Sequence, residues 1–215
     1  MKTIFENIIE LYKKENITLN KNKNGHYAID QKDTGWSITE NEINYLLRYK
    51  SYFDNPKIYI VGNAFGFSTF CFQYIFENAS IDVIDAEIEG EFNSYGSELT
   101  RKISKENNFN INLTKGFSPG DVKDSMRFDK YDIVFIDGLH TDDQVIADYT
   151  AVHPYFNNNY ICFLHDVRST PLYRSFNTII ENFRGTYSDY ITELDYSISE
   201  SGMGIITNGY SLIKN

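Results

Sequence analysis

Residues 57–69 read KIYIVGNAFGFST, an apolar run followed by a glycine turn and a pair of hydroxyl residues. A short run of isoleucine, valine and tyrosine is typical of a strand that is buried on both faces of a sheet. The glycines permit a tight turn, and Ser68 and Thr69 stand where a helix would begin. The stretch therefore predicts a strand, a turn and a helix, which together form the first unit of a parallel α/β sheet.

The same alternation continues toward the C-terminus. Four further apolar runs, separated by stretches with helical spacing, predict buried strands at residues 81–84, 111–113, 131–136 and 160–164. Two final runs, at residues 190–197 and 204–207, are joined by a short turn that favours an antiparallel pair. Because crossovers between parallel strands are right-handed, the sequence predicts an α/β, Rossmann-like, doubly wound sheet that is mostly parallel.

The N-terminal quarter has a different pattern. Apolar side chains at helical spacing predict an amphipathic helix at residues 4–12, followed by a loop. A capping box at residues 39–42 begins a second helix, which stops before Pro56. We find neither a linker nor an internal repeat. We therefore expect a single domain over residues 1–215, with a helical cover over 1–55 and a sheet core over 56–215.

The composition excludes several classes of function. Twenty lysines and arginines against thirty acids leave a net charge of −10. A cationic surface for a phosphate backbone is therefore absent, and nucleic acid is not an expected partner. No run approaches the roughly 20 apolar residues that span a bilayer, and we recognise no signal peptide. We expect a cytoplasmic protein with buried thiols at Cys71 and Cys162 and no membrane contact, and the sequence leaves a homo-oligomer open.

Polar residues follow the carboxyl ends of the expected strands, where open α/β sheets bind their ligands. The turn around Gly62 and Gly66 would let an anionic ligand approach backbone amides, although Ala64 stands where the dinucleotide fingerprint has a glycine. Asp85 ends the second strand, where a carboxylate can accept hydrogen bonds from both ribose hydroxyls. The alternatives are a simple tight turn and an acid that caps a helix.

The third strand runs into Phe117 and Ser118, which would place an apolar ring and a hydroxyl beside an adenine. The alternative for Phe117 is an ordinary place in the core.

The fourth and fifth strand ends indicate a different chemistry. Asp137 and His140 follow the fourth strand, and His165 and Asp166 follow the fifth. Neighbouring strands would bring Asp137, His165 and Asp166 together, and their oxygen and nitrogen atoms suit Mg²⁺ or Mn²⁺. The alternative is that Asp166 caps a turn and that His165 is a buried imidazole with its hydrogen bonds satisfied.

At these five strand ends the sequence resembles the class I S-adenosylmethionine-dependent methyltransferases, and more narrowly the metal-dependent O-methyltransferases of the catechol and macrolide-sugar type. The resemblance covers residues 57–167 and implies a seven-stranded sheet, S-adenosylmethionine as cofactor and a divalent metal. The cofactor-binding residues that it implies are Gly62, Asn63, Gly66, Ser68, Asp85, Phe117, Ser118 and Asp137. The metal-binding residues that it implies are Asp137, His165 and Asp166, with the last two standing where the catechol enzymes have an acid and an amide.

Two further positions bear on catalysis. His140 falls where the family places its general base, and an imidazole can take a hydroxyl proton at neutral pH. A histidine that only caps or packs is the alternative. Ile60 departs from the family, which places there an acid that holds the cofactor's amino group. Either another acid takes its place, for which Glu87 is the candidate, or cofactor binding is weakened.

The resemblance implies methyl transfer to a hydroxyl group of a small acceptor, with a sugar or polyol ahead of a catechol. The acceptor pocket would be walled by the N-terminal helices and by the segment after Arg168, including Tyr173 and Phe176, and Trp36 could join it or lie in the core. One alternative is a non-catalytic binding protein with the same fold, which Ile60 favours. The other is a nicotinamide-dependent oxidoreductase, which the missing glycine disfavours.

Overall fold

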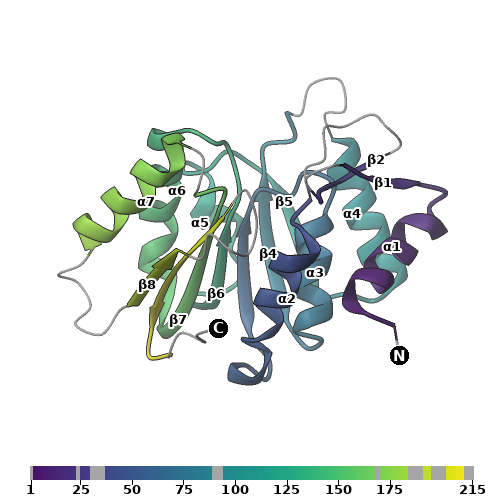
Figure 1. The fold of residues 1–215 in the computed structure, drawn as a ribbon, viewed down its shortest axis with the longest axis horizontal. Helices are drawn as coiled ribbons and strands as arrows, with labels where there is room; N and C mark the ends of the chain where they lie inside the picture. The colour runs from purple at the N-terminus through teal and green to yellow at the C-terminus, as the bar shows by residue number, and fades with distance from the viewer. Residues whose placement is uncertain are drawn as a thin grey trace.

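A computed structural model shows how the chain folds (Figure 1). It describes residues 2–22, 25–29, 37–88, 94–167, 170–183, 191–194 and 202–210. A seven-stranded sheet with the order β5-β4-β3-β6-β7-β9-β8 lies at its centre. The strands are β3 Lys57–Val61, β4 Ser80–Asp85, β5 Ile111–Lys115, β6 Tyr131–Ile136, β7 Phe156–His165, β8 Ile191–Leu194 and β9 Met203–Asn208.

The directions of the strands confirm the predicted fold. β3 pairs in parallel with β4 and β6, and the parallel pairing continues to β5 on one side and β7 on the other. β9 runs antiparallel to both β7 and β8, which confirms the predicted terminal pair. The turn expected between these last two strands falls largely outside the described residues. The chain is thus a doubly wound α/β sheet whose strand order reverses at β3.

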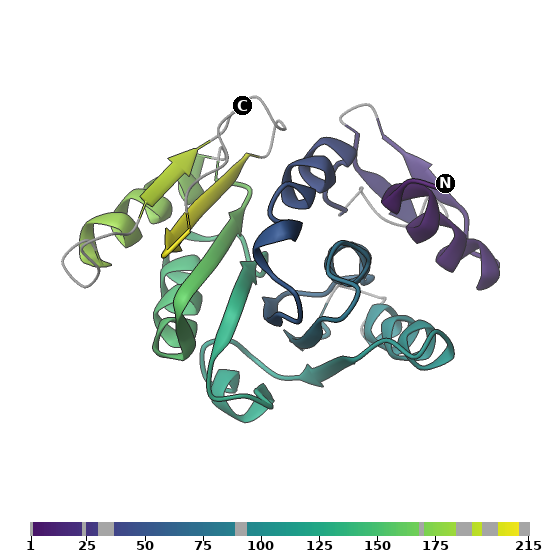
Figure 2. The same cartoon turned by 90° about the horizontal axis from the view of Figure 1, so that it is seen from below.

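Helices cover both faces of the sheet, as Figure 2 shows. One layer holds α1 Ile4–Lys14, α2 Glu40–Leu47, α3 Phe67–Ile75 and α4 Tyr95–Glu106. The other layer holds α5 Val122–Ser125, α6 Asp142–Val152 and α7 Thr170–Phe183. Short 3₁₀ turns occupy Lys50–Tyr52 and His153–Tyr155. The first layer shares one buried core with the sheet, in which Ile8 of α1, Leu46 of α2 and Ile60 of β3 take part.

The N-terminal cover is not purely helical. The segment expected to be a loop after the first helix contains β1, Leu19–Lys21, which pairs antiparallel with β2, Tyr27–Ile29. Each strand is only three residues long, and in β1 an asparagine and a lysine follow Leu19, so neither strand leaves a clear apolar pattern in the sequence. Their apolar side chains nevertheless pack against the core, with Ile29 buried and Leu19 and Tyr27 partly buried. Tertiary packing therefore decides their structure, whereas local propensity does not.

The expected helix cap and the expected buried cysteines are both confirmed. Thr39 and Glu42 form the predicted capping box at the start of α2. Cys71 and Cys162 are buried free thiols. Among the described residues, we find no helix with the length and apolarity that crossing a membrane requires.

Candidate active site

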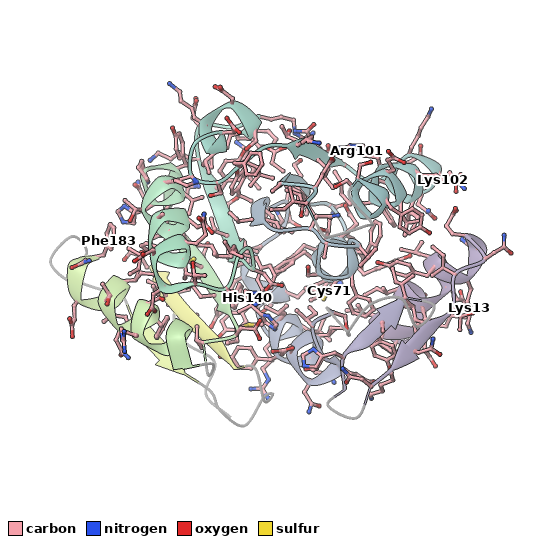
Figure 3. The ribbon with its side chains drawn as sticks, turned by 90° about the horizontal axis from the view of Figure 1, so that it is seen from above. Lys13, Cys71, Arg101, Lys102, His140 and Phe183 are labelled. Carbon is pink, nitrogen blue, oxygen red and sulfur yellow. The ribbon has the colours of Figure 1, made fainter. Side chains whose placement is uncertain are left out.

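The candidate site lies at the carboxyl ends of the central strands, where the strand order reverses between β3 and β6. Connections diverge at such a point, which leaves a crevice for a ligand. Figure 3 looks down on the molecule from this side and shows His140 near the middle. A pocket with about 420 Å³ of empty space lies here, between the N-terminal cover and the turn after β3. Its lining is Tyr12, Leu19, Tyr27, Ile29, Ser37, Gly62, Asn63, Ala64, Phe65, Phe67, Ser68 and Asp137.

The glycine turn after β3 brings the chain very close to the end of β6. Gly62 has a φ of +92°, and a Cβ placed on it would lie 2.1 Å from the backbone oxygen of Asp137. Gly66 has a φ of +91° at the N-cap of α3, and a Cβ there would lie 2.3 Å from Oγ1 of Thr100. Only glycine fits both positions without a shift of the neighbouring elements. Ser68 follows in the first turn of α3 and lines the pocket, as predicted.

Asp85 holds the glycine turn in place. Its Oδ2 accepts hydrogen bonds from the backbone N–H of Asn63 at 2.6 Å and of Ala64 at 3.2 Å, and its Oδ1 accepts one from Glu87 N at 2.7 Å. The carboxylate is almost fully buried. Asp85 therefore shapes the turn, and its contact with a ribose stays a prediction.

Asn63 is held inside the glycine turn. Its side-chain N–H groups donate to the backbone oxygen of Ala64 and to Oγ1 of Thr100, and its Oδ1 accepts from Oγ1 of Thr69. The side chain is 2% exposed and is fully engaged inside the turn. This side chain therefore shapes the turn, and the contact of Asn63 with a cofactor stays a prediction.

The turn after β5 presents an aromatic ring to solvent. Phe117 is 57% exposed, so the alternative that it belongs to the core is wrong. Its backbone N–H donates to Oδ2 of Asp121 at 2.8 Å. The backbone oxygen of the neighbouring Ser118 accepts from Nε2 of Gln144 on α6 at 2.6 Å. A rigid turn thus carries an unpacked ring, which is consistent with the predicted adenine side of a cofactor site.

Three polar side chains converge beside the glycine turn. Nε2 of His140 lies 3.3 Å from Oδ1 of Asp137 and 3.2 Å from Oδ2 of Asp166. One ligand atom from each of these three residues lies within 4.8 Å of the others, so the group could hold a metal ion. The ring of His140 is half exposed, whereas the two carboxylates are mostly covered. We call Asp137, His140 and Asp166 the polar cluster.

His165 lies beneath the polar cluster. Its Nδ1 lies 3.1 Å from Oδ1 of Asp137 and 3.4 Å from Oδ2 of Asp166, which confirms that the predicted three residues meet. Its Nε2 lies 3.0 Å from Oε1 of Glu42 on α2. His165 therefore lies on the buried side of the site, and His140 lies on the side that faces solvent. We expected His140 only as a base.

The charges of these groups shift one another's proton affinity. The hydrogen bond with Asp137 raises the pKa of His140 above its ordinary value. Burial alone would lower the pKa of His165, but the surrounding carboxylates raise it well above the ordinary value. Burial would raise the pKa of Asp137, yet the two imidazoles hold it below its usual range. Carboxylate and imidazole groups with open positions between them are a donor set that fits Mg²⁺ or Mn²⁺.

Glu87, the candidate to replace the acid that is missing at Ile60, is engaged by two cations. One of its oxygens lies 2.9 Å from the guanidinium of Arg101, and the other lies 3.5 Å from Nζ of Lys115. These cations, with a hydrogen bond from Ser97, hold the pKa of Glu87 low against the effect of burial. Ile60 itself is fully buried in the core.

Tyr12 and Tyr27 of the N-terminal cover line the pocket, and their place in an acceptor wall stays a prediction. Phe176 is 1% exposed in the core between α7 and the sheet, so its assignment to the pocket is wrong. Trp36, Arg168 and the side chain of Tyr173 lie outside the described residues.

Two features of the site were missed in the sequence. In the sequence, Glu42 is recognisable only as part of a capping box. That pattern does not indicate that its carboxylate reaches His165. Tyr12 and Tyr27 show as ordinary apolar positions of the cover, yet both line the pocket.

Residues 60–167 match a family model described as a methyltransferase domain. The chain belongs to this family. The match extends from the glycine turn to the pair formed by His165 and Asp166, so it includes every residue of the polar cluster. The resemblance to class I S-adenosylmethionine-dependent methyltransferases is thereby confirmed. A search of curated proteins by sequence found no match.

Solved structures share the fold at low sequence identity. The O-methyltransferase from Bacillus cereus, in complex with S-adenosylhomocysteine, has a TM-score of 0.65 and 11% identity over 96% of this chain and 90% of its own. The O-methyltransferase TomG from Streptomyces achromogenes, involved in tomaymycin synthesis and solved with S-adenosylmethionine, has a TM-score of 0.67 and 10% identity over 97% and 91%. A methyltransferase from Geobacter sulfurreducens has a TM-score of 0.56 and 15% identity over 97% and 89%. These comparisons show that the chain shares its fold with solved methyltransferases.

Proposed function

We propose that the protein is an S-adenosylmethionine-dependent O-methyltransferase that acts on a hydroxyl group of a small molecule, with the help of a divalent cation. One observation carries the proposal: the polar cluster lies directly against the glycine turn, because the Asp137 backbone oxygen occupies the space beside Gly62. A cofactor bound over the turn would have its reactive end beside acid–base groups. That is the arrangement that methyl transfer to oxygen needs.

The cofactor site would extend along three neighbouring strand ends. The methionine part would lie over Gly62, Gly66 and Ser68, and the ribose would approach Asp85 at the end of β4. The exposed ring of Phe117 would pack beside the adenine. The order of β3, β4 and β5 in the sheet supports this placement, because it sets the three contacts side by side.

The cation would be held by Asp137, Asp166 and Nδ1 of His165. When bound, Mg²⁺ or Mn²⁺ would supply Lewis acidity at the acceptor hydroxyl. The donor chemistry supports this assignment, because carboxylates and one imidazole suit these ions better than a closed zinc site.

With a cation on Asp137 and Asp166, those carboxylates would no longer hold a proton on Nε2 of His140, which would then accept the hydroxyl proton as the acceptor oxygen attacks the sulfonium methyl carbon. The new oxygen–carbon bond forms while the sulfur–carbon bond breaks, which leaves S-adenosylhomocysteine and a protonated imidazole that returns its proton to water. The half-exposed ring of His140 supports this role, since a base must reach an incoming acceptor. Holding the two reacting atoms in contact would supply most of the acceleration.

The acceptor would be a small hydroxylated molecule, either a sugar or polyol or a catechol-like compound. The aromatic and aliphatic lining of the pocket supports an acceptor with an apolar face. Tyr27 and Phe67, for example, stack there with ring centroids 5.8 Å apart.

A second candidate is a binding protein that has lost catalysis. Ile60 favours it, because a buried aliphatic side chain stands where the family places an acid for the cofactor's amino group. The ion pairs of Glu87 strengthen the case, since they leave that acid engaged elsewhere.

Removal of the cation tests the first candidate. Incubation with S-adenosylmethionine and a panel of catechols and sugars should release S-adenosylhomocysteine with at least one acceptor. A chelator should lower that release by about tenfold or more, and added Mg²⁺ or Mn²⁺ should restore it. Turnover that persists in the chelator would contradict the role of the cation. Cofactor binding without turnover on any acceptor would favour the binding protein.

A further inference from the structure

Glu42 connects the N-terminal cover to the candidate metal site. It lies in the first turn of α2 and is 0% exposed, although a carboxylate in a capping box needs no burial. Its Oε2 accepts hydrogen bonds from Thr39 N at 2.7 Å and from Thr39 Oγ1 at 2.9 Å, which serves the helix cap. Its other oxygen, Oε1, lies 3.0 Å from Nε2 of His165, which is 123 positions further along the chain. The two oxygens therefore have separate partners.

The equivalent cap on α1 shows what the helix alone requires. Thr3 and Glu6 form the same reciprocal capping box, with Thr3 N donating to Oε2 of Glu6 at 2.7 Å. Glu6 is exposed, and the cap is complete without a buried acid. The burial of Glu42 and its contact with His165 are thus additional to capping.

The contact with Glu42 determines how His165 presents its ring. A carboxylate only accepts hydrogen bonds, so Nε2 of His165 must carry the proton that Oε1 of Glu42 accepts. The other ring nitrogen, Nδ1, faces Oδ1 of Asp137 at 3.1 Å and Oδ2 of Asp166 at 3.4 Å, and there a bound cation would take the place of the proton that Nδ1 shares with these carboxylates. Histidines that bind metals almost always donate their second ring N–H to such a partner, which fixes the orientation and tautomer of the ring.

We propose that Glu42 is a positioning residue of the metal site: through its hydrogen bond to Nε2, it holds His165 with Nδ1 directed to the cation that Asp137 and Asp166 share. This inference rests on the cation of the proposed function. It makes α2, and with it the N-terminal cover, a structural part of the site. The cover then helps to form the metal centre as well as shielding the sheet.

The variant Glu42→Gln separates positioning from capping. Thr39 N can only donate, so the glutamine oxygen is expected to keep the cap and to turn the amide NH₂ toward Nε2 of His165. Nε2 must then accept, so the ring keeps its remaining proton on Nδ1, where it blocks the lone pair that the cation would need. We expect calorimetric affinity for Mn²⁺ to fall about 10- to 100-fold. Affinity for S-adenosylhomocysteine should stay unchanged.

Two controls accompany this measurement. Glu6→Gln makes the same chemical change in the matched cap of α1 and should leave Mn²⁺ affinity at the wild-type value. In a His165→Ala background, Glu42→Gln should cause no further loss, because its effect passes through the imidazole. Melting of the metal-free proteins checks that each variant is folded. If Glu42→Gln does not fold, Glu42→Asp, which keeps a carboxylate but shortens it by one methylene, should lose Mn²⁺ affinity in the same way.

The outcomes distinguish this inference from the proposed function. A wild-type protein that binds Mn²⁺ with the same affinity as a folded Glu42→Gln variant would overturn the positioning role and leave the proposed cation in place. A further loss in the His165→Ala background would also overturn it, because Glu42 would then act by another route. A wild-type protein that binds no Mn²⁺ would overturn the cation, and the positioning role with it.

Discussion

His140→Ala is expected to lower methyl transfer by about 10²- to 10⁴-fold, the range that a positioned general base contributes. The half-exposed ring lies 3.3 Å from Asp137 and 3.2 Å from Asp166, at the solvent side of the polar cluster. Within the described part of the chain, no hydrogen bond joins the His140 ring to the turn around Ser68 or to Phe117. Affinity for S-adenosylhomocysteine should therefore stay at the wild-type value, and turnover should carry the whole loss.

The same variant separates two roles for His140. A base lies outside the metal's ligands, so Mn²⁺ affinity should change little in His140→Ala. A loss of Mn²⁺ affinity as large as that expected for a ligand would place His140 in the metal site, which its position in the polar cluster also permits. Unchanged turnover would remove it from the mechanism altogether.

Gly62→Ala is expected to abolish cofactor binding and to destabilise the protein. The new Cβ would lie 2.1 Å from the backbone oxygen and 2.7 Å from the carbonyl carbon of Asp137, so β3 and β6 could not keep their approach. The left-handed backbone at this position adds strain of about 1–3 kcal/mol. We expect affinity for S-adenosylhomocysteine to fall by well over an order of magnitude and the melting temperature to drop by several degrees.

Gly120→Ala is the matched control for this change. It makes the same substitution on the turn that carries Phe117, but there a Cβ would meet its nearest neighbour, the Phe117 backbone oxygen, only at 3.6 Å. We expect a change in stability within about 0.5 kcal/mol and wild-type cofactor affinity. If Gly62→Ala behaved like Gly120→Ala, the close approach of the glycine turn to Asp137 would have no role in binding.

Most of the fold could be predicted from the sequence, because buried parallel strands leave a strong local pattern. The run from Lys57 to Val61 and the glycine turn after it predict both the strand and the start of α3. The hairpin of β1 and β2 could not be predicted in this way. Its strands are only three residues long, β1 includes an asparagine and a lysine, and contacts with distant parts of the core decide the structure of both strands.

The site was predictable where a strand end fixes the position of a side chain. Asp137, His165 and Asp166 meet as expected, because β6 and β7 are neighbours in register. Partners from distant segments could not be predicted. Glu42 contacts His165 although the two residues are 123 positions apart in the chain. Its place in the capping box of α2 already explains why a glutamate stands there, so nothing in the sequence indicates the second contact.

The partners of two polar side chains near the glycine turn could not be predicted either. Asn63 turns its amide into the protein, and Glu87 pairs with Arg101. From its position in the sequence alone, each of these two side chains could equally well face a ligand. The choice depends on the Thr100 hydroxyl and the Arg101 guanidinium, both supplied by α4.

Calorimetric titration of the wild-type protein with S-adenosylhomocysteine, and separately with NAD, tests most directly whether the glycine turn, Asp85 and Phe117 form a methyltransferase cofactor site. We predict saturable heat of binding with S-adenosylhomocysteine and none with NAD, and we expect Gly62→Ala to remove that heat. Saturable binding of NAD, with no heat from S-adenosylhomocysteine, would contradict the assignment of this site.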